Sequence, residues 1–107
     1  MFTRVVEVTT KPGKARELTR TINDKVVTIL RNQPGFVDEL VLISEQDPDQ
    51  ILALSFWNSK QDAEKYHREQ FPRVTELIQN HTEGPPKVQT FNVEQSTVHK
   101  IAAGKAA

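Results

Sequence analysis

Two neighbouring segments of this chain, residues 36–44 and 51–57, are largely apolar. Short runs that are rich in β-branched and aromatic residues and bounded by turn signals predict strands. The polar stretch between them contains Asp47 before Pro48, which is typical of a turn. The sequence therefore predicts a hairpin that is apolar on both faces, and such a hairpin needs a cover on each face.

The alternation of side chains along a strand divides the hairpin residues between two faces. In the first strand, one face holds Phe36, Leu40 and Leu42, and the other holds Val37, Val41 and Ile43. In the second strand, the two sets are Leu52, Leu54 and Phe56, and Ile51, Ala53 and Trp57. The pattern leaves open which set faces a partner, and we take Val41 and Ile43 as example interface positions.

Two further strands and a helix are predicted on either side of the hairpin. Residues 2–9 are β-branched and half-alternating, which predicts a first strand, and residues 87–94 predict a last one after a break at Gly84-Pro85-Pro86. Apolar residues at steps of three and four predict a helix that runs from Lys14 and ends before Gln33-Pro34-Gly35. Its apolar positions are Ala15, Leu18, Ile22, Val26 and Ile29.

A second helical region follows the hairpin. Asn58 or Ser59 can cap its start, and Phe71-Pro72 interrupts it, with Pro72 opening a new turn. The resulting order, β-α-β-β-α-β, predicts an α+β ferredoxin-like protomer with an antiparallel sheet and its helices on one face. Because the other face is also apolar, we expect a second copy of the chain to pack against it, sheet to sheet, in a homodimer.

The predicted domain covers residues 1–94, and residues 95–107 form a small, polar tail. Val98 and Ile101 are candidate docking points in this tail, and the last residues, 102–107, are expected to fray.

Composition excludes several classes of function. Fourteen Lys and Arg against fourteen Asp and Glu give a net charge of zero, so the basic excess typical of proteins that bind nucleic acid or anionic membranes is absent. There is no long apolar run and no targeting pattern at the start, and we expect a cytoplasmic protein. Without cysteine there is no thiolate metal site, and the three histidines lack metal-ligand spacing, so no metal is predicted.

A series of landmarks resembles a known family. The landmarks are the turn Lys11-Pro12-Gly13-Lys14, the strand start Pro34-Gly35-Phe36, the polar hairpin Glu45-Gln46-Asp47-Pro48-Asp49, and the stretch from Trp57 to Ala63 that leads to His67. In this order they resemble the antibiotic biosynthesis monooxygenase domain of the dimeric α/β-barrel superfamily, over residues 2–94.

The resemblance implies a ferredoxin-like protomer that pairs its sheet with a second copy, and a pocket between sheet and helices. It also implies one of several activities. Cofactor-free oxygenases of this family bind a polyphenolic substrate whose own electrons activate dioxygen, haem-degrading members bind haem, and many small members have no assigned reaction.

The haem-degrading activity is not expected here. Those members carry an axial histidine late in the second helical region, but residues 72–77 contain none, and His81 lies beyond them. The first strand offers no asparagine, and Tyr66 stands where the haem-facing tryptophan is expected. An iron without an axial ligand is not held, so we predict no haem and no other cofactor.

Trp57 and His67 match landmarks of the family and are the candidate catalytic residues. Trp57 could form a pocket wall that stacks on a flat substrate and donates its N–H, or it could be a core residue at a strand end. His67 could be a general base or donor at the pocket mouth, or a partly exposed helix residue. Many members have a glutamate two residues before the tryptophan, where this chain has Ser55.

The candidate substrate-binding residues are Trp57, Tyr66, Phe71, Arg4 and Asn92. Polar residues within strands can line a pocket, meet a partner or be solvated, and here they are Arg4, Glu7, Asp38, Glu39 and Asn92.

The predicted function is a small cofactor-independent monooxygenase that acts on an aromatic or quinol-type molecule. The alternative is a non-catalytic dimeric module that binds a small ligand or only assembles. An enzyme needs a cavity of roughly several hundred Å³. In a packed module, Trp57, Tyr66 and Phe71 fill that space instead.

Overall fold

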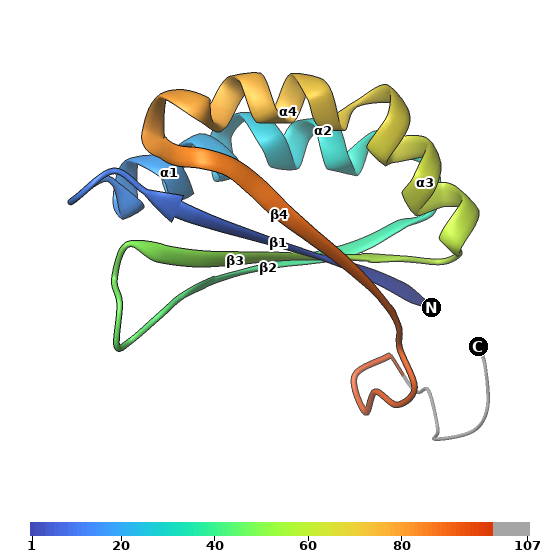
Figure 1. The fold of residues 1–107 in the computed structure, drawn as a ribbon. Helices are drawn as coiled ribbons and strands as arrows, with labels where there is room; N and C mark the ends of the chain where they lie inside the picture. The colour runs from blue at the N-terminus through green and yellow to red at the C-terminus, as the bar shows by residue number, and fades with distance from the viewer. Residues whose placement is uncertain (100–107) are drawn as a thin grey trace.

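The computed structural model describes residues 1–99 (Figure 1). Its elements are β1 (Phe2–Thr10), α1 (Ala15–Thr21), η1 (Ile22–Val26), α2 (Val27–Arg31), β2 (Phe36–Ile43), β3 (Gln50–Trp57), α3 (Lys60–Glu69), α4 (Phe71–Ile78), η2 (Gln79–His81) and β4 (Thr82–Asn92). The predicted order of strands and helical regions is confirmed. None of the helices within residues 1–99 is long and apolar enough to cross a membrane.

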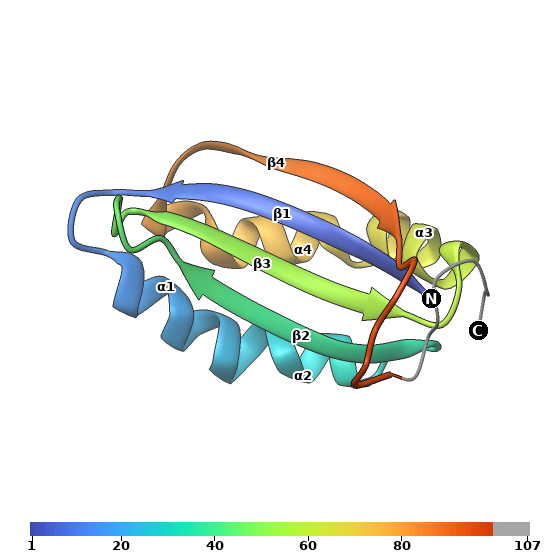
Figure 2. The same cartoon turned by 90° about the horizontal axis from the view of Figure 1, so that it is seen from below.

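The four strands form one antiparallel sheet in the order β2-β3-β1-β4. All helices lie on the same face of this sheet, which Figure 1 shows from the side and Figure 2 shows from the uncovered face. This is the ferredoxin-like α+β fold that the sequence predicts.

The core lies between the helix layer and the covered face of the sheet. The largest fully buried side chains are Trp57, Leu18, Leu30, Ile51 and Thr10. The apolar spacing that predicts the first helix places Leu18, Ile22 and Val26 in this core, as expected of an amphipathic helix.

The first helix contains a feature that the sequence does not predict. Between α1 and α2, the segment η1 forms a π-helical turn whose Ile22 and Val26 are buried in the core. Such turns carry wider hydrogen-bonded loops than the α-helix and occur often at functional sites.

The start of α3 rests on two residues that the sequence marks. Ser59 is the N-cap, and its hydroxyl accepts a hydrogen bond from the backbone N–H of Asp62 at 3.2 Å. Gly35 has a φ of +77°, and a Cβ there would lie only 2.0 Å from the carboxylate of Asp62. A side chain at position 35 would therefore push the end of the first helical region away from α3.

The structure corrects the assignment of Phe36 to the face of Leu40 and Leu42. A bulge between Phe36 and Asp38 shifts the register, so Phe36 pairs with Trp57 and lies on the helix side. Beyond the bulge, Val41 pairs with Ala53 and Ile43 with Ile51, which places both on the helix side as well. They are therefore not on the uncovered face, where an interface residue is needed.

The last strand is longer than predicted. It begins at Thr82, so Gly84-Pro85-Pro86 lies inside β4 and does not end the preceding element. The pairing with β1 is irregular between Glu7 and Thr9, next to this segment. Proline is tolerated there because β4 is an edge strand, where one row of N–H groups has no partner strand to bind.

The uncovered face of the sheet is apolar over three strands. Leu40 and Leu42 of β2 are 45% and 46% exposed, and Phe91 of β4 is 49% exposed. Between them lie the half-buried side chains of Leu52, Leu54 and Phe56 on β3. We call this set of six residues the open-face patch, and a patch of this kind typically marks an interface.

The tail turns back beneath the uncovered face (Figure 1). The ring of His99 lies 5.8 Å from that of Phe56, and Val93 donates a backbone hydrogen bond to Met1. Val98 is 81% exposed and does not dock on the described chain, contrary to expectation. Ile101 and residues 102–107 lie outside the described residues.

A dimer that buries the open-face patch stays a prediction, and Leu54→Glu tests it. A charge at the centre of a buried interface leaves an unpaired carboxylate, so the variant is expected to shift the protein from dimer to monomer. Sedimentation of the wild type should give twice 12.2 kDa. Thr28→Glu on the exposed side of α2 is the control and should leave the dimer intact. A wild type that is monomeric at micromolar concentration would contradict the prediction.

Candidate functional site

The space between the helix layer and the sheet is nearly filled. The remaining inner cavity measures about 40 Å³, which is room for about one water molecule. Its wall is apolar except for Arg4, Glu39, Ser55 and Tyr66. The polar groups that converge on this cavity come from β1, β2, β3 and α3, so the fold assembles them from distant parts of the sequence.

Two grooves flank the inner cavity, and each has the volume of a site for a ring system. The β2 groove measures about 470 Å³ and is lined by Thr19, Ile22, Asn23, Val27, Arg31, Phe36, Val37, Asp38, Glu39 and Val41. The α3 groove measures about 400 Å³ and is lined by Phe2, Arg4, Lys60, Ala63, Glu64, His67, Val88 and Thr90. Glu39 lines both the inner cavity and the β2 groove, whereas Arg4 lines both the inner cavity and the α3 groove.

Arg4 is a cation buried on the covered face of the sheet, with 2% of its surface exposed. Its guanidinium lies over the ring of Phe71, 4.6 Å from the centroid, and over that of Tyr66 at 5.0 Å. Within residues 1–99, no carboxylate lies within ion-pair distance of it. Burial lowers the pKa of Arg4 and the Tyr66 phenol opposes that effect, but a guanidinium stays charged at neutral pH. The two aromatic faces therefore replace an anion as its electrostatic partners.

His67 holds the guanidinium from the side of α3. Nη2 of Arg4 donates to Nδ1 of His67 at 2.8 Å, which assigns the remaining proton of the neutral ring to Nε2. Burial and the charge of Arg4 both lower the pKa of His67, so the ring is neutral near pH 7. Its ring also stacks on Phe71 at 5.3 Å. In this arrangement, His67 can donate from Nε2, while its lone pair at Nδ1 is already occupied.

Trp57 lies in the core and lines neither groove nor the inner cavity. Its indole N–H donates to the Ser55 hydroxyl at 2.9 Å, so the donor that was predicted for a substrate is engaged within the protein. The centroid of its ring system lies 5.6 Å from that of the Phe36 ring and 5.0 Å from that of the Tyr66 ring. Ser55, which replaces the glutamate of many family members, thus serves as the acceptor for this indole.

Tyr66 connects the charged groups of the inner cavity. It is 3% exposed, and burial raises its pKa to about 12, with Arg4 lowering it and Glu39 raising it. The phenol is therefore neutral at physiological pH and keeps its proton for donation. The ring centroids of Phe71 and Tyr66 lie 6.3 Å apart, and both residues line the inner cavity.

Glu39 is a half-buried carboxyl on β2, opposite Ser55 of β3. Burial raises its pKa to about 7, and the neighbouring carboxylate of Asp38 adds to the effect. Sequence reasoning noted Glu39 among the polar strand residues but did not place it in the site. The available signal was the acidic pair Asp38-Glu39 in an otherwise apolar strand, but the bulge after Phe36 decides which way Glu39 faces.

The remaining candidates are dispersed. Asn92 is exposed at the end of β4 and lines none of the three spaces. His81 lies in η2 with Nε2 at 3.3 Å from the Thr21 hydroxyl and Nδ1 at 3.8 Å from Glu17. Among residues 1–99, no group of three or more His, Cys, Asp or Glu side chains could hold a metal ion.

The pair of Trp57 and Ser55 can be tested by a double-mutant cycle. Trp57→Phe removes the N–H and part of the ring, and is expected to lower the free energy of unfolding by roughly 2 kcal/mol. Ser55→Ala leaves the indole N–H without an acceptor, and the two changes should couple by about 1 kcal/mol. Urea unfolding of the four proteins measures this coupling, and additive effects would show that the hydrogen bond contributes nothing.

The raised pKa of Glu39 predicts a pH-dependent stability. Folded protein keeps the Glu39 proton up to about pH 7, whereas the unfolded chain loses it near 4.5. The burial of Glu39 therefore costs more stability as the pH rises through this window. Glu39→Gln is expected to exceed the wild type by up to about 3 kcal/mol above pH 7 and to lose this advantage toward pH 4.5. Urea unfolding across this range, with exposed Glu83→Gln as the control, measures the difference, and a pH-independent one would contradict it.

Comparison with solved structures shows the same fold in several proteins. A monooxygenase of Streptomyces coelicolor, solved with the ligand nanaomycin D, is 24% identical with a TM-score of 0.70, over 89% of this chain and 88% of that one. The cofactor-independent oxygenase SnoaB of Streptomyces nogalater is 15% identical with a TM-score of 0.74, over 90% of this chain and 95% of that one. A conserved protein of Methanosarcina mazei is 17% identical with a TM-score of 0.70, over 85% of this chain and 91% of that one. At these identities, the likeness shows the fold alone.

Sequence comparison gives the family. No curated protein matches this chain in sequence. The profile of the antibiotic biosynthesis monooxygenase family matches residues 1–72, which include Arg4, Glu39, Tyr66 and His67. The fold and this match agree with the resemblance that the sequence landmarks indicate, and the chain belongs to the antibiotic biosynthesis monooxygenase family.

Proposed function

We propose that this protein is a cofactor-independent monooxygenase that acts on a hydroxylated aromatic, quinol-type molecule. The observation that carries the proposal is the guanidinium of Arg4, which is buried without a carboxylate partner beside the inner cavity. A cation held in this way stabilises an anion that forms next to it. The anion expected in this chemistry is the phenolate or enolate of the substrate.

Such a reaction needs no bound cofactor for its electron balance. When a ring methylene of an anthrone becomes a carbonyl, the carbon gives up four electrons, which are the four that dioxygen accepts. One oxygen atom enters the carbonyl and the other leaves as water with the two hydrogens. The protein's part is to bind the ring, stabilise its deprotonated form and keep the site largely free of water.

The residues around Arg4 have positioning roles in this proposal. His67 fixes the guanidinium through Nδ1, and Phe71 and Tyr66 support it from their faces. Trp57 acts through Tyr66, because its ring packs against that ring at a tilt and lines neither groove. Two solved proteins with this fold support the proposal: one is a cofactor-independent oxygenase, and the other is a monooxygenase solved with the ligand nanaomycin D.

A second candidate is the non-catalytic dimeric module that binds a small aromatic ligand. It is favoured by the inner cavity, because Trp57, Tyr66 and Phe71 fill the space between the layers and leave about 40 Å³. A ring must then lie mainly in one of the flanking grooves. The homodimer, the aromatic ligand and the cytoplasmic location remain proposals for both candidates.

Arg4→Met tests the function. Methionine keeps much of the side-chain volume but removes the cation, and the loss of one such donor is expected to lower turnover about 10²–10³-fold. The measurement is oxygen uptake with a panel of hydroquinones and hydroxylated anthrones, together with the absorbance of the bound ligand, which reports whether it is a phenolate. In the variant, the bound ligand should stay protonated.

Arg68→Met is the matched control, since Arg68 is exposed on α3 and its guanidinium lies 3.6 Å from the carboxylate of Glu69. It should turn over substrate like the wild type. Ligand binding without oxygen uptake in the wild type would favour the non-catalytic module. A wild type that neither binds nor oxidises any member of the panel would exclude both candidates for this class of ligand.

A further inference from the structure

The carboxyl of Glu39 lines the β2 groove and has no partner among the described residues. Glu39 lies where the groove meets the inner cavity. Within residues 1–99, its carboxyl has no hydrogen-bond donor and no ion-pair partner, although it is half-buried and opposite Ser55. A half-buried carboxyl without a donor or a cation beside it costs stability, and a functional role is one reason for a protein to keep it.

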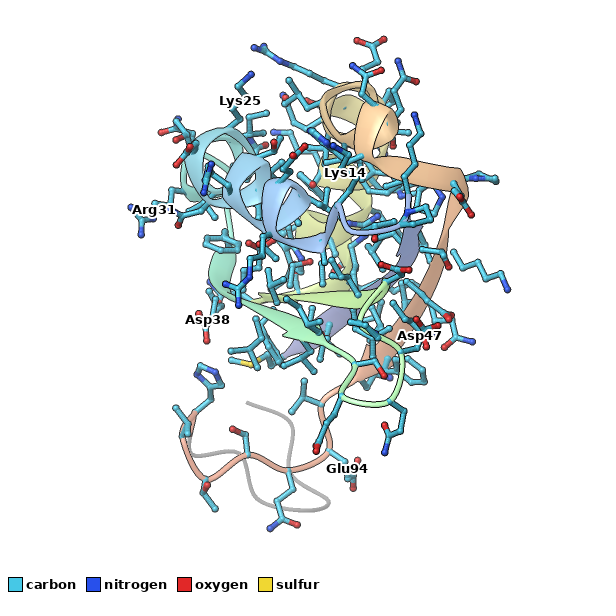
Figure 3. All side chains as sticks on the ribbon, turned by 90° about the vertical axis from the view of Figure 1, so that its left-hand side faces the viewer. Lys14, Lys25, Arg31, Asp38, Asp47 and Glu94 are labelled. Carbon is cyan, nitrogen blue, oxygen red and sulfur yellow. The ribbon has the colours of Figure 1, made fainter. Side chains whose placement is uncertain are left out.

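The charged and titratable groups that share a space with Glu39 lie on β1, β2, α2 and α3, whereas its pairing partner on β3 is the uncharged Ser55. Asp38 precedes it on β2, Arg31 lies across the groove on α2, and Arg4 and Tyr66 share the inner cavity with it. Figure 3 shows Arg31 and Asp38 at the same edge of the molecule, one at the helix layer and the other at the sheet. Glu39 therefore shares the β2 groove with Arg31 and the inner cavity with Arg4.

The opposite wall of the groove is the π-helical turn. Ile22 and Asn23 of η1 both line the β2 groove. Phe36 adds an aromatic face, and its ring contacts Trp57 edge to face. The groove thus offers an aromatic wall, an amide side chain and a carboxyl within a volume that suits a planar hydroxylated ring.

We propose that the substrate ring lies in the β2 groove and that Glu39 is the group that takes its proton. This inference rests on the proposed function and assigns the acid–base residue of the same site. The bond that breaks is an O–H of a quinol or a C–H of an anthrone methylene. The proton goes to a carboxylate oxygen of Glu39, and the electron pair stays on the substrate as the phenolate or enolate that dioxygen then oxidises. The proton returns to the reduced oxygen as water forms.

Other groups near the inner cavity are poorly suited to this step. Arg4 has no lone pair to offer. Tyr66 is protonated at neutral pH, because burial raises its pKa to about 12. The Nδ1 lone pair of His67 already accepts from Arg4. Glu39, with a pKa raised to about 7 by burial and by Asp38, has the basicity that proton transfer at neutral pH requires.

The test compares Glu39→Gln with the wild type in oxygen uptake with a hydroxylated anthrone between pH 5 and 9. In the wild type, kcat/KM should rise with an apparent pKa near 7. Glu39→Gln should lower kcat/KM about 10²–10⁴-fold and abolish this rise. Glu39→Ala should regain part of its activity with added formate, which supplies a carboxylate in the vacated space. Deuterium at the anthrone methylene should slow a reaction in which this proton is removed.

Asp38→Asn tests the acid–base role of Glu39 through the pH dependence of kcat/KM, which a purely structural role of Glu39 would not change. Because Asp38 raises the pKa of Glu39, its neutralisation should shift the rise in kcat/KM to lower pH. Glu83→Gln, on exposed β4, is the control and should leave the profile unchanged. An active wild type with an equally active, folded Glu39→Gln overturns this inference and leaves the proposed function standing. A wild type that is inactive on the whole panel overturns both.

Discussion

The helix layer covers only one face of the sheet, and this constraint organises the rest of the molecule. Two helical regions occupy the covered face and bury Trp57, Leu18, Leu30 and Ile51 beneath them. The hairpin of β2 and β3 is apolar on its other face too, and the open-face patch stays about half exposed at Leu40, Leu42 and Phe91. We expect a second copy of the chain to cover this patch, because a symmetric dimer interface buries the same patch on both protomers.

The covered face also confines the polar groups of the site. Arg4 is buried among rings, so its charge must be supported by Tyr66, Phe71 and His67, each of which is drawn from α3 or α4. Low polarity strengthens electrostatic interactions, which makes this cation effective toward an anion in the adjoining space. The same low polarity raises the pKa of Glu39. In the proposed reaction, this one environment would favour both the stabilisation of an anion by Arg4 on β1 and the uptake of a proton by Glu39 on β2.

The distribution of volume separates the two candidate functions. Aromatic side chains fill the centre of the layer interface, while the grooves beside β2 and α3 have the volume of ligand sites. A catalytic reading places the ring at the edge of the layers, with its reactive group directed inward toward Arg4 and Glu39. A binding module would use the same grooves but would have no need of a half-buried carboxyl without a partner. That carboxyl is the feature that favours catalysis.

The sequence alone predicts the order of elements, a helix cap at Asn58 or Ser59 and the two largely apolar faces of the hairpin, because these depend on local periodicity and turn chemistry. The structure selects Ser59 as the cap. The sequence also carries the landmarks of the family. Only the tertiary structure decided which residues meet. The bulge after Phe36 turns that ring toward Trp57 and sets the face of Glu39, and it depends on pairing between strands. The π-helical turn and the contact of Arg4 with His67, 63 residues apart, depend on packing between layers, which no local pattern in one sequence records.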